Sequence, residues 1–166
     1  MRVVIGLGSN LGRRIDYLQG ALDALFDAPG LVFVAVSPVY ETDPVGGPEQ
    51  GPYLNAVVIA ETMLDPRALL DRAQSIENAF GRERRERFGP RTLDVDLIAV
   101  GTLTSDDPEL TLPHPRAHER AFVLVPWAQA DPAAVLPGRG PVADLLADLD
   151  QSGVRPRPDL ALEPPV

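Results

Sequence analysis

The chain has 166 residues, 45% hydrophobic and 23% charged, a balance typical of one globular domain with its own core. It has no cysteine, which excludes disulfides and thiolate metal sites, and its first apolar run is too short for a signal peptide or a membrane span. We therefore expect a soluble cytoplasmic protein, and the formal net charge of −9 predicts no nucleic-acid and no membrane partner.

The first part of the chain alternates apolar runs with a helical stripe. Residues 2–7 predict a buried strand, and the apolar residues from Leu11 to Leu25 recur at four-and-three spacing, which predicts a helix. Residues 31–40 predict a second strand, in which Pro38 indicates an edge position or a bulge. After a loop rich in glycine and proline, residues 53–61 predict a third strand.

A second helix and a fourth strand complete the pattern. Asp65 and Pro66 are the N-cap and first helical residue of a helix whose apolar stripe runs to Phe80. Residues 93–100 predict the fourth strand. The order predicts an α+β, ferredoxin-like βαββαβ core: an antiparallel sheet with both helices on one face, and loops to cover the other.

The last part of the chain is expected to extend this core. Residues 122–125 are apolar and should pack on it, and residues 142–149 predict a short helix. Residues 151–166 carry four prolines and predict a poorly ordered tail. We therefore expect a single domain over residues 1–150, followed by that tail.

Charge of both signs is concentrated in residues 81–96, GRERRERFGPRTLDVD. Five arginines lie between Arg82 and Arg91, and strand alternation places Asp94 and Asp96 on one face. Two such carboxylates can converge on Mg²⁺, while guanidinium groups make forked contacts with phosphate, so the stretch fits phosphoryl transfer. The alternatives are solvated charges, a two-metal nucleotidyl transferase or cyclase, and a non-catalytic binding module.

Three polar residues have more than one interpretation. Asn55 lies among apolar neighbours in the third predicted strand, so its amide needs partners, which could be structural or belong to a ligand. Gln74 and Glu77 are three residues apart and share a face of the second helix. We interpret that face as solvated.

Five motifs stand in the order and at the spacing of a known family. They are IGLGSNLG at 5–12, SPVYETDPVGG at 37–47, YLNAVV at 53–58, GRERRERFGPRTLDVDLI at 81–98 and LPHPRAHERAF at 112–122. Over residues 1 to about 137 the chain resembles the 6-hydroxymethyl-7,8-dihydropterin pyrophosphokinases of folate biosynthesis. The resemblance implies a ferredoxin-like enzyme that transfers the β,γ-pyrophosphoryl group of ATP to the hydroxymethyl oxygen of the dihydropterin and releases AMP. We expect this enzyme to be a monomer.

For ATP, the resemblance implies a site around the charged stretch. Asp94 and Asp96 match the ligands of two Mg²⁺ ions, and Arg82 and Arg91 match catalytic arginines that stabilise the moving pyrophosphoryl group. The other residues that match nucleotide contacts are Gln74, Glu77, Arg84, Thr111, His114 and Arg120. The chain departs from better-known members at Phe88, Glu109 and Pro115, and the resemblance gives no role to Arg85, Arg87 or His118.

For the pterin, the resemblance implies a site on the glycine- and proline-rich loop and the third strand. Tyr53 and Phe122 match two aromatic residues that sandwich the bicyclic ring. Asn55 matches the residue that pairs with the polar edge of the ring. The residues that match the loop lining the ring are Thr42, Asp43, Pro44 and Val45.

Overall fold

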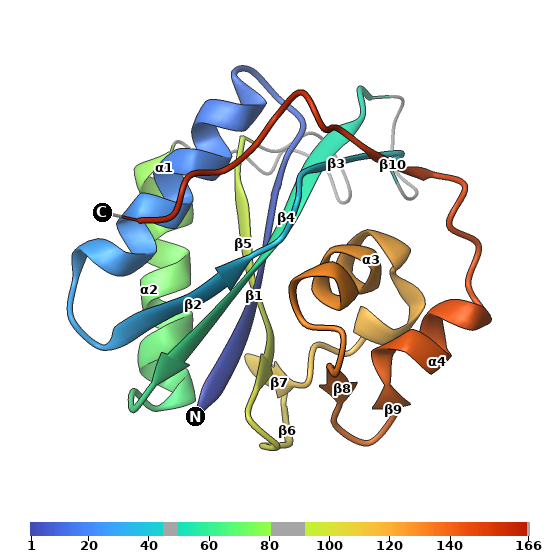
Figure 1. Cartoon of the computed structure of the whole chain (residues 1–166). Helices are drawn as coiled ribbons and strands as arrows, with labels where there is room; N and C mark the ends of the chain where they lie inside the picture. Colours follow the sequence, from blue (N-terminus) through green and yellow to red (C-terminus); the bar gives the residue numbers. More distant parts are fainter. Residues whose placement is uncertain (45–49, 81–91, 166) are drawn as a thin grey trace.

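The structure, a computed structural model, describes residues 1–44, 50–80 and 92–165 (Figure 1). The core elements, in chain order, are β1 (Arg2–Ser9), α1 (Arg14–Asp27), β2 (Leu31–Val36), β3 (Tyr40–Thr42), β4 (Tyr53–Thr62), α2 (Pro66–Ala79) and β5 (Asp94–Val100). The later elements are β6 (Ser105–Asp107), β7 (Leu110–Leu112), the 3₁₀ turn η1 (Ala117–Glu119), α3 (Ala121–Ala130), β8 (Val135–Leu136), β9 (Gly140–Pro141), α4 (Val142–Ala147) and β10 (Val154–Pro156). No helix in these ranges is long and apolar enough to cross a membrane.

The main sheet runs in the order β10-β3-β4-β1-β5, with β2 also paired to β4. Every pair is antiparallel, and β1 lies between β4 and β5, which are its two neighbours. This arrangement confirms the α+β class and has the element order predicted for a ferredoxin-like core. The sheet therefore brings the ends of β1, β4 and β5 together although they lie far apart in the sequence.

The second predicted strand is divided into β2 and β3. Between them, the backbone N–H of Ser37 donates to Val57 O and the Ser37 hydroxyl accepts from Val57 N, each at 2.9 Å. Pro38 has no N–H to continue the ladder, so the strand breaks at this point. The predicted edge or bulge at Pro38 is thus a complete interruption, and β3 starts anew at Tyr40.

The start of α2 follows the prediction, whereas α1 begins later than predicted. Asp65 accepts a 2.9 Å hydrogen bond from Ala68 N and so caps α2. Gly12 adopts a φ of +73° and turns the chain before α1, which leaves Leu11 outside the helix and 42% exposed. The helical stripe that reaches the core therefore begins after Leu11.

Helices cover both faces of the sheet (Figure 1). α1 and α2 pack on one face, against Val3, Ile5 and Leu7 of β1 and the residues beside them. On the other face Val4 packs with α3, whose buried residues include Trp127. The expectation that only loops cover this second face is therefore wrong. The helix is hard to predict because it is apolar on nearly all sides and contains a proline.

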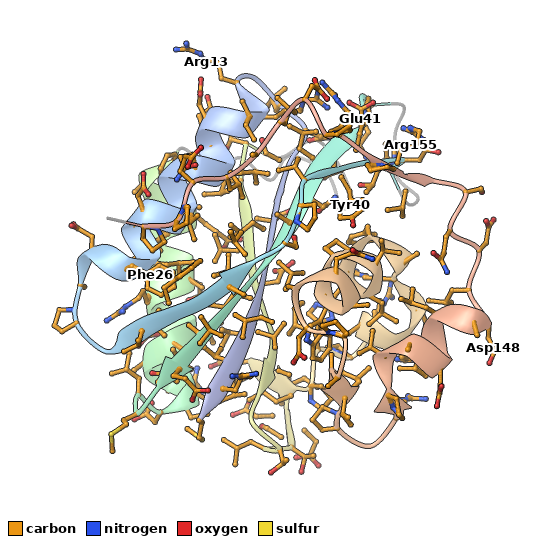
Figure 2. The ribbon with its side chains drawn as sticks, in the orientation of Figure 1. Arg13, Phe26, Tyr40, Glu41, Asp148 and Arg155 are labelled. Carbon is orange, nitrogen blue, oxygen red and sulfur yellow. The ribbon has the colours of Figure 1, made fainter. Side chains whose placement is uncertain are left out.

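The C-terminal residues are not the poorly ordered tail that their composition predicts. Val154–Pro156 pairs with β3 in the register Val154↔Thr42, Arg155↔Glu41 and Pro156↔Tyr40. Further on, Leu162 is only 7% exposed and belongs to the same core cluster as the buried residues of α1. A free sheet edge provides backbone partners that composition does not indicate, and proline is tolerated in an edge strand. Figure 2 shows this segment crossing the sheet beside Glu41.

Candidate functional site

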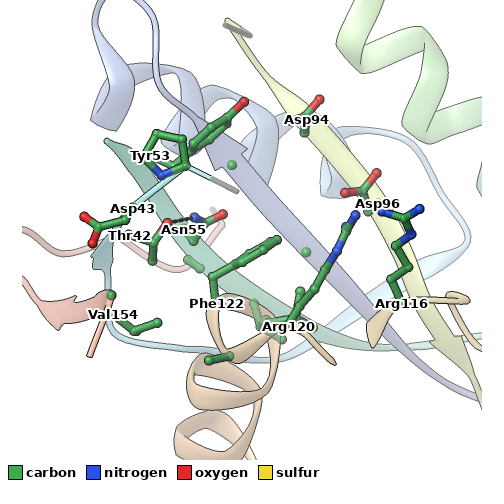
Figure 3. A pocket seen from close by; sticks show the side chains of 18 of the residues that line it. Thr42, Asp43, Tyr53, Asn55, Asp94, Asp96, Arg116, Arg120, Phe122 and Val154 are labelled. Atoms are coloured by element: carbon green, nitrogen blue, oxygen red, sulfur yellow. Dashed lines mark hydrogen bonds between the residues drawn. The ribbon is translucent and has the colours of Figure 1, made fainter. Parts of the chain in front are cut away.

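A cavity of about 690 Å³ lies between the second face of the sheet and α3 (Figure 3). The sequence of β1 explains the space. Along the face of β1 that turns toward α3, Val4 is followed by Gly6 and Gly8, which have no side chains to fill it. The sheet therefore packs against α3 at the Val4 end of β1, and at the Gly8 end a cavity separates the two.

Most of the described residues that the sequence predicted for the site line this cavity. They are Thr42, Asp43, Pro44, Tyr53, Asn55, Asp94, Asp96, His114, Arg120 and Phe122. Val45, Arg82, Arg84 and Arg91 lie outside the described residues. Gln74, Glu77 and Thr111 are described but do not line the cavity.

Glu77 contradicts the prediction of a solvated face on α2. It is 3% exposed, and its Oε2 accepts a 2.9 Å hydrogen bond from the backbone N–H of Val95. Val95 stands between Asp94 and Asp96, so this contact braces the strand that carries both carboxylates. Gln74, by contrast, is exposed as predicted.

Asn55 is held at the back of the cavity. It is 7% exposed, and its Nδ2 donates a 2.6 Å hydrogen bond to Thr42 Oγ1. Gly8 is its partner on β1, and a Cβ atom added to Gly8 would lie 2.8 Å from Asn55 Oδ1. The requirement for glycine at this position was missed in the sequence, although a glycine inside a strand is a signal of close approach.

Two aromatic residues reach the cavity from different layers. Tyr53 begins β4, and Phe122 lies in the first turn of α3. The guanidinium carbon of Arg120 lies 5.3 Å from the centre of the Phe122 ring, a cation–π distance. The cavity therefore offers aromatic surface on the side of the sheet and on the side of α3.

Asp94 and Asp96 lie on the face of β5 that turns to the cavity, as the alternation predicts. Both are partly exposed, while Val95 and Leu97 between and beyond them are buried on the opposite face. In the described ranges no group of three or more His, Cys, Asp or Glu side chains could hold a metal ion. Mg²⁺ needs no such cage, because it is commonly held by one or two carboxylates together with substrate phosphates. The pair fits that role.

His114 is fixed beside Asp96 by its own backbone and ring. The backbone N–H of His114 donates to Ile98 O at 2.8 Å, and the ring Nδ1 accepts from the backbone N–H of Arg116 at 3.2 Å. Burial lowers the pKa of His114; Asp96 opposes this, and Arg120 and Arg116 lower it further. The ring is therefore neutral near pH 7, and because Nδ1 accepts, Nε2 carries the proton.

Positive charge faces the aspartates from the segment between β7 and α3. Figure 3 shows the guanidinium groups of Arg116 and Arg120 pointing toward Asp96. Burial lowers the pKa of Arg120, with Asp96 opposing the shift, but an arginine remains charged at any ordinary pH. Arg116 was missed in the sequence, although it is one of the arginines of LPHPRAHERAF.

The C-terminal segment supplies a wall that the sequence did not predict. Asp150, Ser152, Gly153 and Val154 all line the cavity. They reach it because β10 pairs with β3, the strand that ends at Thr42. No local pattern in these residues indicates this placement.

The cavity and fold can be compared with known proteins. A family model described as 7,8-dihydro-6-hydroxymethylpterin-pyrophosphokinase (HPPK) matches residues 4–132. The 2-amino-4-hydroxy-6-hydroxymethyldihydropteridine pyrophosphokinase of Mycobacterium tuberculosis strain H37Rv is 50% identical over 162 residues, covering 90% of this chain and 84% of that one. The protein of the same name from Pseudomonas aeruginosa is 42% identical over 157 residues, covering 95% and 97%.

Solved structures give the same fold at lower identity. The wild-type HPPK-DHPS of Plasmodium falciparum with SDX-DHP superimposes with a TM-score of 0.69 at 14% identity. The match covers 88% of this chain and 44% of that one, so the chain spans less than half the length of the solved chain.

Proposed function

The chain belongs to the 7,8-dihydro-6-hydroxymethylpterin-pyrophosphokinase family, and we propose that it transfers the β,γ-pyrophosphoryl group of ATP to 6-hydroxymethyl-7,8-dihydropterin and releases AMP. The family gives the class of reaction: pyrophosphoryl transfer to a hydroxymethyldihydropterin in folate biosynthesis. One observation supports this activity most directly. A single cavity has a polar and aromatic half around Asn55 and a charged half around Asp94 and Asp96.

The Asn55 half suits a flat, polar heterocycle. Its amide oxygen is an acceptor, and the amide group has a second N–H beside the one given to Thr42. A pterin presents donors and acceptors along one edge, so the amide can pair with that edge while Tyr53 and Phe122 contact the ring faces. The hydrogen bond to Thr42 fixes the amide before the ligand arrives, which lowers the entropy cost of binding.

The charged half suits a triphosphate. Asp94 and Asp96 would hold Mg²⁺, two ions in our proposal, which when bound neutralises phosphate charge and orients the phosphate chain. Arg120 would contact phosphate oxygens, and neutral His114 can donate from Nε2 without adding charge. The ATP roles of Arg82, Arg84, Arg91, Gln74, Glu77 and Thr111 remain predictions from the resemblance.

The reaction requires positioning more than covalent chemistry from the protein. The hydroxymethyl oxygen loses its proton, which is released to solvent, and forms a bond to the β-phosphorus. The bond from that phosphorus to the bridging oxygen of the α-phosphate breaks, and AMP leaves. Asn55 would fix the ring that carries the alcohol, and Arg120 the phosphates that it must approach. Holding both partners in one cavity removes much of the entropy cost of their encounter.

Product analysis tests this function. The protein is incubated with ATP, Mg²⁺ and 6-hydroxymethyl-7,8-dihydropterin, and we expect AMP and the pterin diphosphate in equal amounts. Release of pyrophosphate without AMP would instead indicate a nucleotidyl transferase, and no turnover at all would indicate a binding module. The double variant Asp94→Ala/Asp96→Ala should lose the activity, while Asp106→Ala, at an exposed position in the β6–β7 hairpin, should keep it.

A further inference from the structure

The C-terminal wall of the cavity lies outside the region that the family model matches, which ends at residue 132. Its residues nevertheless line the cavity next to the predicted pterin-binding loop. In β10, Val154 and Arg155 point to opposite sides because side chains alternate along a strand. Val154 contributes to the cavity, so Arg155 is directed at the other side of the segment.

Arg155 contacts the loop rather than the cavity. Its Nη2 donates a 2.9 Å hydrogen bond to Asp43 Oδ1, and it lies 3.8 Å from Glu41. The backbone N–H of Asp43 also donates to Gly153 O at 2.9 Å. Asp43 is thus tied to the C-terminal segment through its backbone and through its side chain.

The same segment is linked to the far end of the loop through Glu41. Arg157 Nη1 lies 2.8 Å from Glu41 Oε2, and Arg14 Nη1 lies 3.3 Å from the same oxygen. Arg14 also donates to the backbone O of Pro52 at 3.0 Å. One carboxylate therefore connects the C-terminal segment with the chain on both sides of residues 45–49.

We propose that Arg155 is a positioning residue for the pterin side of the cavity, and that it acts by holding Asp43 in place. This inference rests on the proposed function, because it assigns a task to the wall of that cavity. The ion pair is exposed, with 46% and 60% of the two side chains accessible, and exposed ion pairs contribute little to stability. What the ion pair determines is the position of Asp43, and with it the positions of Thr42 and Pro44 on either side.

Arg155→Ala is the central variant, with Arg139→Ala as the matched control. Arg139 is exposed and also C-terminal, but it lies in the turn between β8 and β9 and not in β10. Pterin binding is measured by calorimetry with Mg²⁺ and a non-hydrolysable ATP analogue, alongside kcat, both KM values and Tm. We expect Arg155→Ala to raise the Kd and KM for the pterin about two- to fivefold. Its kcat, its KM for ATP and its Tm should stay close to those of the wild type and of Arg139→Ala.

Three further variants separate positioning from a general effect. Arg155→Lys should restore part of the pterin affinity, because lysine keeps the charge but not the forked donor. Gly153→Ala places a Cβ 3.3 Å from Asp43 Oδ2 and should weaken pterin binding with Arg155 intact. If Arg155 acts through Asp43, the double variant Arg155→Ala/Asp43→Ala should bind the pterin no more weakly than Asp43→Ala alone.

Each other outcome overturns the inference. An Arg155→Ala protein with wild-type pterin affinity, or with pterin and ATP affinity reduced in parallel with Tm, would show that Arg155 positions nothing specific to the pterin. Additive effects in the double variant would show that it does not act through Asp43. A wild-type protein that binds no pterin would overturn the proposed function itself, which the wild-type titration reveals before any variant is compared.

Discussion

Asn55→Ala is the substitution that tests the pterin half of the cavity most sharply. Asn55 offers its Oδ1 and the N–H that is not given to Thr42, so two hydrogen bonds to the ligand are lost. At about 1.5 kcal/mol for each lost bond, pterin binding weakens by about 3 kcal/mol, or roughly 100-fold. The affinity for ATP should change little, because Asp94 and Asp96 stand on another strand.

Calorimetric titration with the pterin, in the presence of Mg²⁺ and a non-hydrolysable ATP analogue, measures this loss directly. Thr42→Val is the matched comparison, because it removes the partner that orients the amide but keeps the amide itself. Its loss should be clearly smaller than that of Asn55→Ala. A pterin Kd within threefold of wild type for Asn55→Ala, with the protein folded, would refute the assignment of Asn55 to the heterocycle.

Three other predictions follow from the same geometry. Gly8→Ala should weaken pterin binding about tenfold, because its Cβ would lie 2.8 Å from Asn55 Oδ1. Gly51→Ala should bind like wild type in the same titration, because among the described residues no atom lies within 4 Å of the added Cβ. Asp96→Asn should raise the Mg²⁺ concentration for half-maximal turnover about tenfold, and an unchanged Mg²⁺ dependence would argue against a ligand role. The pKa of His114 is lower in the folded protein than in the unfolded protein. The contribution of His114 to the free energy of unfolding should therefore be constant well above pH ~6.5 and fall as the pH drops through that value. Urea titrations of the metal-free protein should show a smaller fall for His114→Gln, and an identical fall in both proteins would contradict the burial argument.

The core could be predicted because local signals and packing agree there. The capping residues of α2 and the alternation of Asp94 and Asp96 on β5 are local patterns, and the structure keeps them. β10 could not be predicted, because its order comes from pairing with a strand more than a hundred residues earlier in the chain. For α3 the apolar residues leave no polar face from which a helical period could be recognised.

The same distinction applies to the site. Asn55, Tyr53 and Phe122 were predicted for the site from the resemblance, and β4 and α3 bring them to one cavity. The burial of Glu77 could not be predicted, because its carboxylate accepts a hydrogen bond from the backbone N–H of Val95. Val95 lies in β5, which follows the arginine stretch in the sequence. The proposed role of Arg155 could not be predicted either, because its partner Asp43 lies 112 residues before it.

The way α3 closes the second face has a practical consequence for spectroscopy. The chain has a single tryptophan, Trp127, which is 3% exposed on this helix, one and a half turns after Phe122. Fluorescence excited selectively at tryptophan therefore reports from one position, in the packing between α3 and the sheet. A change in that emission when the pterin binds would register a shift of the helix that carries Phe122, with no label introduced and no second indole to confuse the signal.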